Sequence, residues 1–223
     1  METLLLSARL ACCVAGVLLL LGMPLAYWMA RTKWRGKFLL ESVVALPLVL
    51  PPTVLGFYLL MAMGSHGPLG KIWIRLFGHT LAFTFTGLVV ASVVYSLPFA
   101  VQPLLSAFEG VDERLLDAAA VLGAGRWRSF RQVLLPLSVR GVITAGVLSF
   151  AHTLGEFGVV LMVGGNIPGV TRTLSVSIYD RVQALDYASA SATSLFLLVL
   201  SFVMLAFIYG LNRSTRALWP GVR

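Results

Sequence analysis

Four polar side chains interrupt an otherwise apolar stretch in the second half of the chain. They are Ser149, His152, Thr153 and Glu156. Separations of three, one and three positions place all four on one side of a helix. Ionisable residues inside an apolar span usually face the bundle interior or a water-filled cavity. This polar stripe is therefore the candidate lining of a path through a membrane.

Other roles for the stripe compete with path lining. A metal site is disfavoured, because His152 and Glu156 supply two ligands and no third is evident. A structural role, in which Glu156 receives hydrogen bonds from broken backbone or from a partner subunit, stays open beside lining or gating. Hydrolysis within the membrane is also disfavoured, because the apolar stretches contain no catalytic serine–histidine pair, aspartate pair or His-Glu-x-x-His motif.

The composition indicates the class of protein to which the stripe belongs. Of 223 residues, 58% are hydrophobic and 12% charged, whereas soluble domains are about half apolar and a quarter charged. The formal charge of +8 does not indicate nucleic acid, because no basic stripe with interleaved aromatics accompanies it. We therefore expect an integral membrane protein.

Five apolar segments reach the roughly 20 residues that a helix needs to cross a bilayer. They are Leu10–Ala30, Ser42–Met63, Leu81–Ala107, Leu137–Val163 and Tyr187–Leu211. The sequence thus predicts an all-α, polytopic protein with about five transmembrane helices, forming a single domain over residues 1–223.

The lysines and arginines predict the orientation of these spans. Five of the 17 fall on the side of the amino terminus, namely Arg9, Lys71, Arg75, Arg172 and Arg181. The other twelve fall in the opposite loops and at the carboxyl terminus. Because positive residues favour the cytoplasmic side, we expect an extracytoplasmic amino terminus and a cytoplasmic carboxyl terminus.

Prolines divide two of the spans. The second contains Pro47, Pro51 and Pro52, and the third contains Pro98 and Pro103. Proline removes a backbone donor and clashes with the preceding turn. We expect both helices to be kinked or locally unwound, which suits a translocation path, although a packing kink without function explains the pattern as well.

The loop over residues 108–136 is too polar for the bilayer and too regular for a linker. Asp112 is placed to cap a first short helix, on which Leu115, Ala119 and Leu122 share a face, and Gly123 is placed to end it. A second short helix follows, with Trp127, Phe130 and Leu134 on one side, and Pro136 is expected to end it. Its aromatics and arginines suit the membrane interface.

At this loop the chain resembles the permease subunits of ABC importers. The run from Asp117 through Ala118 and Ala119 to Gly123, followed by a Leu-Pro at Pro136, is similar to their "EAA" signature, with aspartate in place of the usual glutamate. Leu-Gly-Glu-Phe-Gly at 154–158 is shared by molybdate, sulfate and tungstate permeases. Asn-Ile-Pro-Gly at 166–169 with Thr-Arg-Thr at 171–173 favours molybdate.

The resemblance implies a type I ABC importer permease fold and several partners. Expected are a homodimer in the inner membrane, cytoplasmic ATPase subunits that dock on the 108–136 loop, and an extracytoplasmic molybdate-binding protein. No cofactor is expected in this chain, since it lacks a phosphate-binding Gly-x-x-x-x-Gly-Lys-Ser/Thr loop and ATP would be bound by the ATPase subunit. A tungstate or sulfate permease and an ion-gradient-driven secondary transporter are the alternatives.

Overall fold

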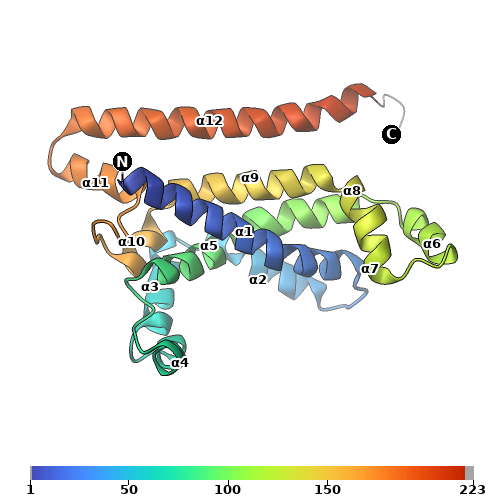
Figure 1. Ribbon diagram of the computed structural model, residues 1–223, viewed down its shortest axis with the longest axis horizontal. Coiled ribbons are helices and arrows are strands. Elements are labelled where there is room, and N and C mark those ends of the chain that lie inside the picture. The colour runs from blue at the N-terminus through green and yellow to red at the C-terminus, as the bar shows by residue number, and fades with distance from the viewer. Residues whose placement is uncertain (1, 219–223) are drawn as a thin grey trace.

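The computed structural model describes residues 2–218, which form helices and connecting loops and contain no strand. The helices are α1 (Glu2–Arg31), α2 (Lys37–Val49), α3 (Pro52–Met63), α4 (Pro68–Phe77), α5 (Phe85–Glu109), α6 (Glu113–Val121), α7 (Arg126–Ser129), the π-helix η1 (Phe130–Leu134), α8 (Leu135–Leu137), α9 (Val139–Gly155), α10 (Gly158–Gly164), α11 (Leu174–Gln183) and α12 (Tyr187–Leu218). The expected all-α fold is confirmed (Figure 1).

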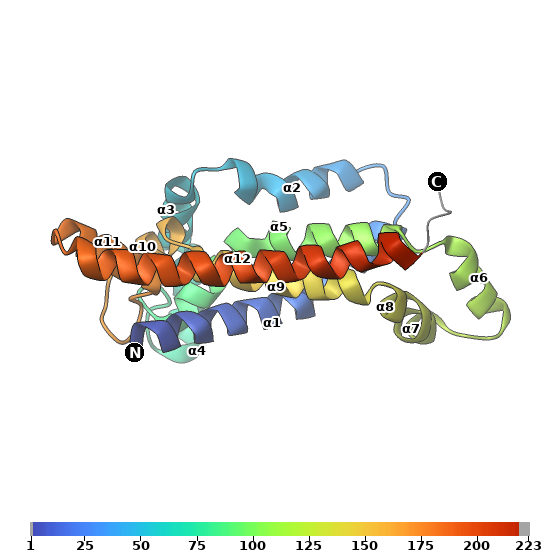
Figure 2. The same ribbon diagram turned by 90° about the horizontal axis from the view of Figure 1, so that it is seen from above.

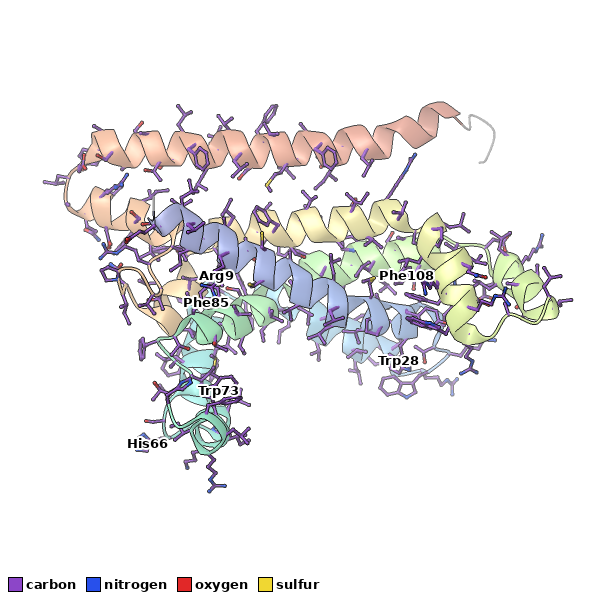
Figure 3. The ribbon with its side chains drawn as sticks, viewed as in Figure 1. Arg9, Trp28, His66, Trp73, Phe85 and Phe108 are labelled. Carbon is purple, nitrogen blue, oxygen red and sulfur yellow. The ribbon has the colours of Figure 1, made fainter. Side chains whose placement is uncertain are left out.

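Helices α1, α5 and α9 form the centre of the bundle and pack on one another. Val14 and Leu18 of α1 and Leu88 of α5 are fully buried in one apolar cluster. A second cluster near the 108–136 loop contains Leu104 and Phe108 of α5 (Figure 3). Helices α1 and α2 lie on opposite sides of α5 (Figure 2).

The second predicted span is broken where its prolines predict a break. Helix α2 ends at Val49, Leu50 is extended with ψ of 135°, and α3 begins at Pro52 after a bend of 110°. Proline suits this first helical position, because its missing N–H would have no partner there. Helix α3 then packs on α10, so the bend joins two regions of the fold.

The third span stays helical at its prolines, so the expectation of local unwinding is wrong there, while the expected kink stays a prediction. Helix α5 continues without a break through Pro98 and Pro103. Ala100, Val101 and Leu104, which surround the two prolines, are fully buried. Tertiary packing thus holds the helix where two backbone hydrogen bonds are lost.

The fourth span is interrupted at a place without proline. Helix α9 ends at Gly155, Glu156 has an extended backbone with ψ of 133°, and α10 begins at Gly158. A Cβ built on Gly158 would lie 2.6 Å from Cβ of Pro52. The interruption therefore brings α10 close to the start of α3, and the expectation of a continuous fourth helix is wrong.

Helix α12 lies along one side of the bundle and buries little of its surface (Figure 1). Its apolar window has a mean hydropathy of 2.5 and is only 6% buried. Large side chains such as Leu198, Phe202 and Val203 are at least half exposed. Such a surface is stable against lipid or another apolar protein surface, not against water.

Candidate functional site

His152 and Thr153 of the polar stripe contact α5 in the protein interior. Ser149 and Thr153 are 0% and 2% exposed. The hydroxyl of Ser96, on α5, lies 3.1 Å from Thr153 Oγ1 and 2.9 Å from His152 Nδ1. One buried hydroxyl thus links two members of the stripe, which stabilises the contact between α5 and α9.

His152 lies among aromatic side chains of α5. Its ring stacks on Phe99 at a centroid distance of 3.9 Å and an interplanar angle of 23°. Tyr95 lies 4.9 Å away on the same helix. The imidazole is therefore fixed by stacking and by its hydrogen bond with Ser96, and its orientation does not depend on Glu156.

Glu156 lies in the interior, as the stripe predicts, with 4% of its surface exposed. It does not extend α9 but follows it, at the interruption before α10. Neither carboxyl oxygen has a hydrogen-bond partner among the described residues, and the hydroxyl of Ser92 lies close without meeting hydrogen-bond geometry. The position of Glu156 relative to a subunit interface stays a prediction.

An open pocket of about 530 Å³ lies at the interruption between α9 and α10. It is lined by His152, Glu156, Tyr95, Thr53 and Pro52, and by Ala151, Gly155, Phe157 and Gly158. Ser149 and Thr153 do not line it: Ser149 is fully buried, and Thr153 is turned into the contact with α5. The stripe is thus divided into a wall of the pocket and a buried part.

Sequence reasoning missed the residues that α3 and α5 contribute to this region. Ser92, Tyr95 and Ser96 are separated by three and one positions, the helical spacing that revealed the stripe in α9. Thr53 directly follows the prolines of the second span. The described residues contain no group of three or more histidine, cysteine or acidic side chains placed to hold a metal ion.

The first helix of the 108–136 loop has the predicted ends. Asp112 caps α6 by accepting a hydrogen bond of 2.9 Å from the backbone N–H of Arg114. Gly123 adopts a left-handed φ of +82°, and its N–H donates to Ala120 O at 2.9 Å. The N–H of Ala124 donates to Ala119 O at 2.9 Å, which completes a Schellman motif.

The predicted apolar face of α6 is only partly directed toward the protein. Ala119 is half-buried, whereas Leu115 and Leu122 are 48% and 86% exposed. The inward contact is made instead by Leu116, which packs against the cluster around Phe108. Asp117 and Ala118 are exposed, so most of the signature lies on the surface.

The rest of the loop is firmly attached to the bundle. Phe130 packs edge-on against Tyr27 of α1 at 5.2 Å, and Leu134 is fully buried. The turns continue through a π-helix and past Pro136 to Leu137, so Pro136 does not end the second helix as expected. Packed side chains therefore connect the loop to α1, α5 and α9.

The Asn-Ile-Pro-Gly and Thr-Arg-Thr motifs form one hydrogen-bonded loop between α10 and α11. Asn166 Nδ2 donates to both carboxyl oxygens of Asp180 at 2.7 Å. Arg172 Nε donates to Asn166 Oδ1 at 2.6 Å. Thr171 Oγ1 donates to Gly164 O at 2.7 Å. These residues fix the loop at the end of the bundle that contains the amino terminus.

Comparison with known proteins identifies the family. The family described as "Binding-protein-dependent transport system inner membrane component" matches residues 22–217. The molybdenum transport system permease protein ModB of Azotobacter vinelandii is 54% identical over 208 residues, with 93% of this chain and 92% of the relative covered. ModB of Escherichia coli (strain K12) is 42% identical, with 86% and 83% covered. The sulfate permease protein CysT of the same strain is 35% identical, with 90% and 71% covered.

A solved structure has the same fold. The bacterial ABC transporter involved in the import of the acidic polysaccharide alginate contains a chain that superposes with a TM-score of 0.71 at 19% identity, covering 96% of this chain and 80% of that one. Since the family match extends over most of the sequence, this multi-pass chain belongs to the inner membrane components of binding-protein-dependent transport systems.

Proposed function

We propose that this chain is the membrane-spanning permease subunit of an ATP-driven importer of molybdate. The observation that carries the proposal is the 54% identity, over nearly the full length of both chains, to a molybdenum permease. The sulfate permease is less similar, at 35%. The ordered 166–173 loop, with its Asn-Ile-Pro-Gly and Thr-Arg-Thr motifs, supports the same substrate.

The translocation path in this proposal passes the pocket between the two interrupted helices. The breaks at Leu50–Pro51 and Glu156–Phe157 lie next to each other, because Gly158 contacts Pro52. Non-helical backbone at membrane depth is typical of places that line a cavity or lie buried in protein. His152 and Glu156 form polar parts of the wall. The wall contains no lysine or arginine, and a path that held the anion tightly would release it slowly, so we assign selectivity to the binding protein.

Coupling to ATP hydrolysis is assigned to α6. Val121 and Leu122 are 88% and 86% exposed at its end, an apolar surface that a partner protein would cover. Arg31 contacts Glu113 at 3.5 Å and Lys37 contacts Glu109 at 2.6 Å, which ties the start of the loop to α1 and α2. We expect a separate ATPase subunit to bind ATP and dock here, on the cytoplasmic side.

The other partners follow from the same proposal. The alginate transporter has been solved in complex with a substrate-bound periplasmic protein. We expect a molybdate-loaded binding protein to dock at the opposite end from α6, on an extracytoplasmic surface that includes the 166–173 loop. The exposed apolar surface of the chain leaves room for a second copy of the subunit as well as lipid.

Reconstitution tests the function directly. Proteoliposomes containing this chain, its ATPase subunit and the binding protein are loaded with ATP, and uptake of molybdate, tungstate and sulfate is measured. We expect ATP-dependent molybdate uptake that persists when ion gradients are collapsed. Uptake driven by an ion gradient without ATP would refute the importer class, and a clear preference for sulfate would refute the substrate only.

A further inference from the structure

An apolar groove runs between the second half of α1 and the short helix α7. Its volume is about 500 Å³, and it is lined by Leu20, Met23, Pro24 and Tyr27 of α1 and by Arg126, Trp127 and Phe130. The lining is almost entirely apolar, and the groove is open to the outside. It is separate from the pocket at Glu156, with which it shares no residue.

The groove continues the outward-facing side of α1. Leu20 and Leu21 are 70% and 54% exposed, and both lie in the apolar window of this helix. Exposed apolar side chains on a membrane-spanning helix are stable against acyl chains, and we expect lipid to cover this part of α1. The groove is thus continuous with the exposed apolar side of α1 and ends at α7, beside the carboxyl-terminal half of α1.

The aromatic wall of the groove is a set of packed rings with one open face. Trp127 stacks on Phe130 at 5.6 Å and 19°, and Phe130 packs against Tyr27. Trp127 itself is 72% exposed. Tryptophan and tyrosine are typical of the membrane–water interface, where an apolar ring meets polar headgroups.

The charge at the mouth of the groove is positive. Arg126 is the charged residue that lines it, and Arg128 and Arg131 follow on the same segment. Within the described part of the chain Arg126 forms no ion pair. Asp117 shares a smaller pocket with Arg126 on its other side but does not line the groove. The mouth therefore favours an anionic group.

We propose that this groove binds one anionic phospholipid, with an acyl chain along Leu20, Met23 and Pro24 and the phosphate at Arg126. An apolar channel that opens to lipid and ends at an unpaired guanidinium matches the two chemical parts of such a molecule. Bound there, the lipid would fill the space between α1 and α7 and fix the segment that connects α6 to the bundle.

Quenching of tryptophan fluorescence by brominated lipid tests the proposal. The assembled transporter, with its ATPase subunits, is placed in bilayers that contain brominated phosphatidylglycerol or brominated phosphatidylcholine. The signal of Trp127 is obtained by subtracting the spectrum of Trp127→Phe, which keeps the aromatic stack. We expect phosphatidylglycerol to quench Trp127 at about a fivefold lower mole fraction, the ratio for ~1 kcal/mol from one arginine at an anionic surface.

A matched pair of variants assigns the selectivity to the groove. Arg126→Gln should abolish the preference for phosphatidylglycerol. Arg128→Gln removes the same charge from the same helix, but Arg128 does not line the groove and bonds to Gln132 at 3.0 Å, so this variant should keep the preference. Equal quenching by the two lipids in the unmodified protein, absence of quenching because protein covers Trp127, or equal loss in both variants would overturn the proposal.

Discussion

Glu156 is unusual because its buried carboxyl group has no hydrogen-bond partner in the described chain. Removing the polar group should therefore cost little stability, since a buried polar group without a partner itself opposes folding. The proposed path gives it a role that stability alone does not require, because an apolar wall hinders the passage of a hydrated anion. Substitutions of Glu156 can therefore change the polarity of the side chain while keeping its size.

Substitution of Glu156 by leucine should leave assembly intact and reduce transport. We expect Glu156→Leu to reach the membrane in near-normal amount and to lower molybdate uptake by about tenfold or more, whereas Glu156→Gln, which keeps a polar group of the same size, should stay within about threefold. Uptake in proteoliposomes and the quantity of assembled complex are the measurements. Normal uptake by the leucine variant would remove this pocket from the path.

Glycine is needed at position 123 for its backbone conformation and not for lack of space around it. Its φ is +82°, and an added Cβ would meet nothing within 4 Å. A β-branched residue there costs about 1–3 kcal/mol of local strain, which the exposed turn can relieve by changing direction. The expected damage therefore concerns how α6 is presented to a partner and leaves the spans in place.

Variants at Gly123 and Gly125 separate this effect from a change in surface shape. We expect Gly123→Val to insert normally but to lose transport and the stimulation of ATP hydrolysis by loaded binding protein. Gly125 has an ordinary φ of −66° and equally open surroundings, so Gly125→Val should retain both activities. Asparagine tolerates the left-handed region, so Gly123→Asn should retain most activity. Full coupling in Gly123→Val would argue against the proposed docking role.

At the scale of elements, the sequence predicted the break at Pro51 and Pro52 but not the break after Gly155. Proline at 51 and 52 signals a break locally, because it lacks a donor and restricts the preceding residue. The break after Gly155 has no such signal and depends on the contact of Gly158 with Pro52, more than a hundred residues away. Helices α4 and α11 were also missed, since ten-residue amphipathic helices are too short to register as spans.

The contact between α3 and α10 can be tested by filling it. A Cβ at Gly158 would lie 2.6 Å from Pro52, whose ring cannot move aside as a flexible side chain could. We expect Gly158→Val to lower stability by about 1–3 kcal/mol and so to lower the unfolding temperature in detergent. Gly155→Val, three residues earlier with open space around it, should change the unfolding temperature far less. Equal effects would show that the close approach is not what holds the interruption.

At the scale of the whole molecule, the candidate site shows what helical spacing in the sequence can predict and what it cannot. Helical spacing in the sequence revealed the polar stripe of α9, because spacing is a property of a single element. It could not assign Thr153 to the α5 contact and Glu156 to the pocket, because that division depends on where α3 and α5 lie. The exposure of α12 could not be predicted for the same reason. Its sequence predicts a membrane span, and only the fold shows how little of this helix the rest of the chain covers.

The two ends of the bundle differ in charge, and this difference predicts orientation. The amino-terminal end of α1 lies with α4 and α11, while α6, α7 and the last turns of α12 lie at the opposite end (Figure 1). Lysines and arginines are concentrated at the α6 end. Because cytoplasmic loops are enriched in positive residues, we expect α6 in the cytoplasm and the amino terminus outside.

Labelling of single cysteines in intact cells, by a maleimide that does not cross the membrane, measures the orientation. In a background of Cys12→Ala and Cys13→Ala, Lys71→Cys in α4 should be labelled from outside, whereas Arg114→Cys in α6 should be labelled only after the cells are opened. Both substitutions replace an exposed basic side chain, so reactivity in opened cells should be similar and serves as the control. Labelling of Arg114→Cys but not of Lys71→Cys in intact cells would reverse the orientation and place α6 out of reach of a cytoplasmic ATPase. Labelling of both variants in intact cells would mean that the number of membrane crossings between α4 and α6 is even. Either result would contradict the proposed coupling mechanism, whatever the substrate.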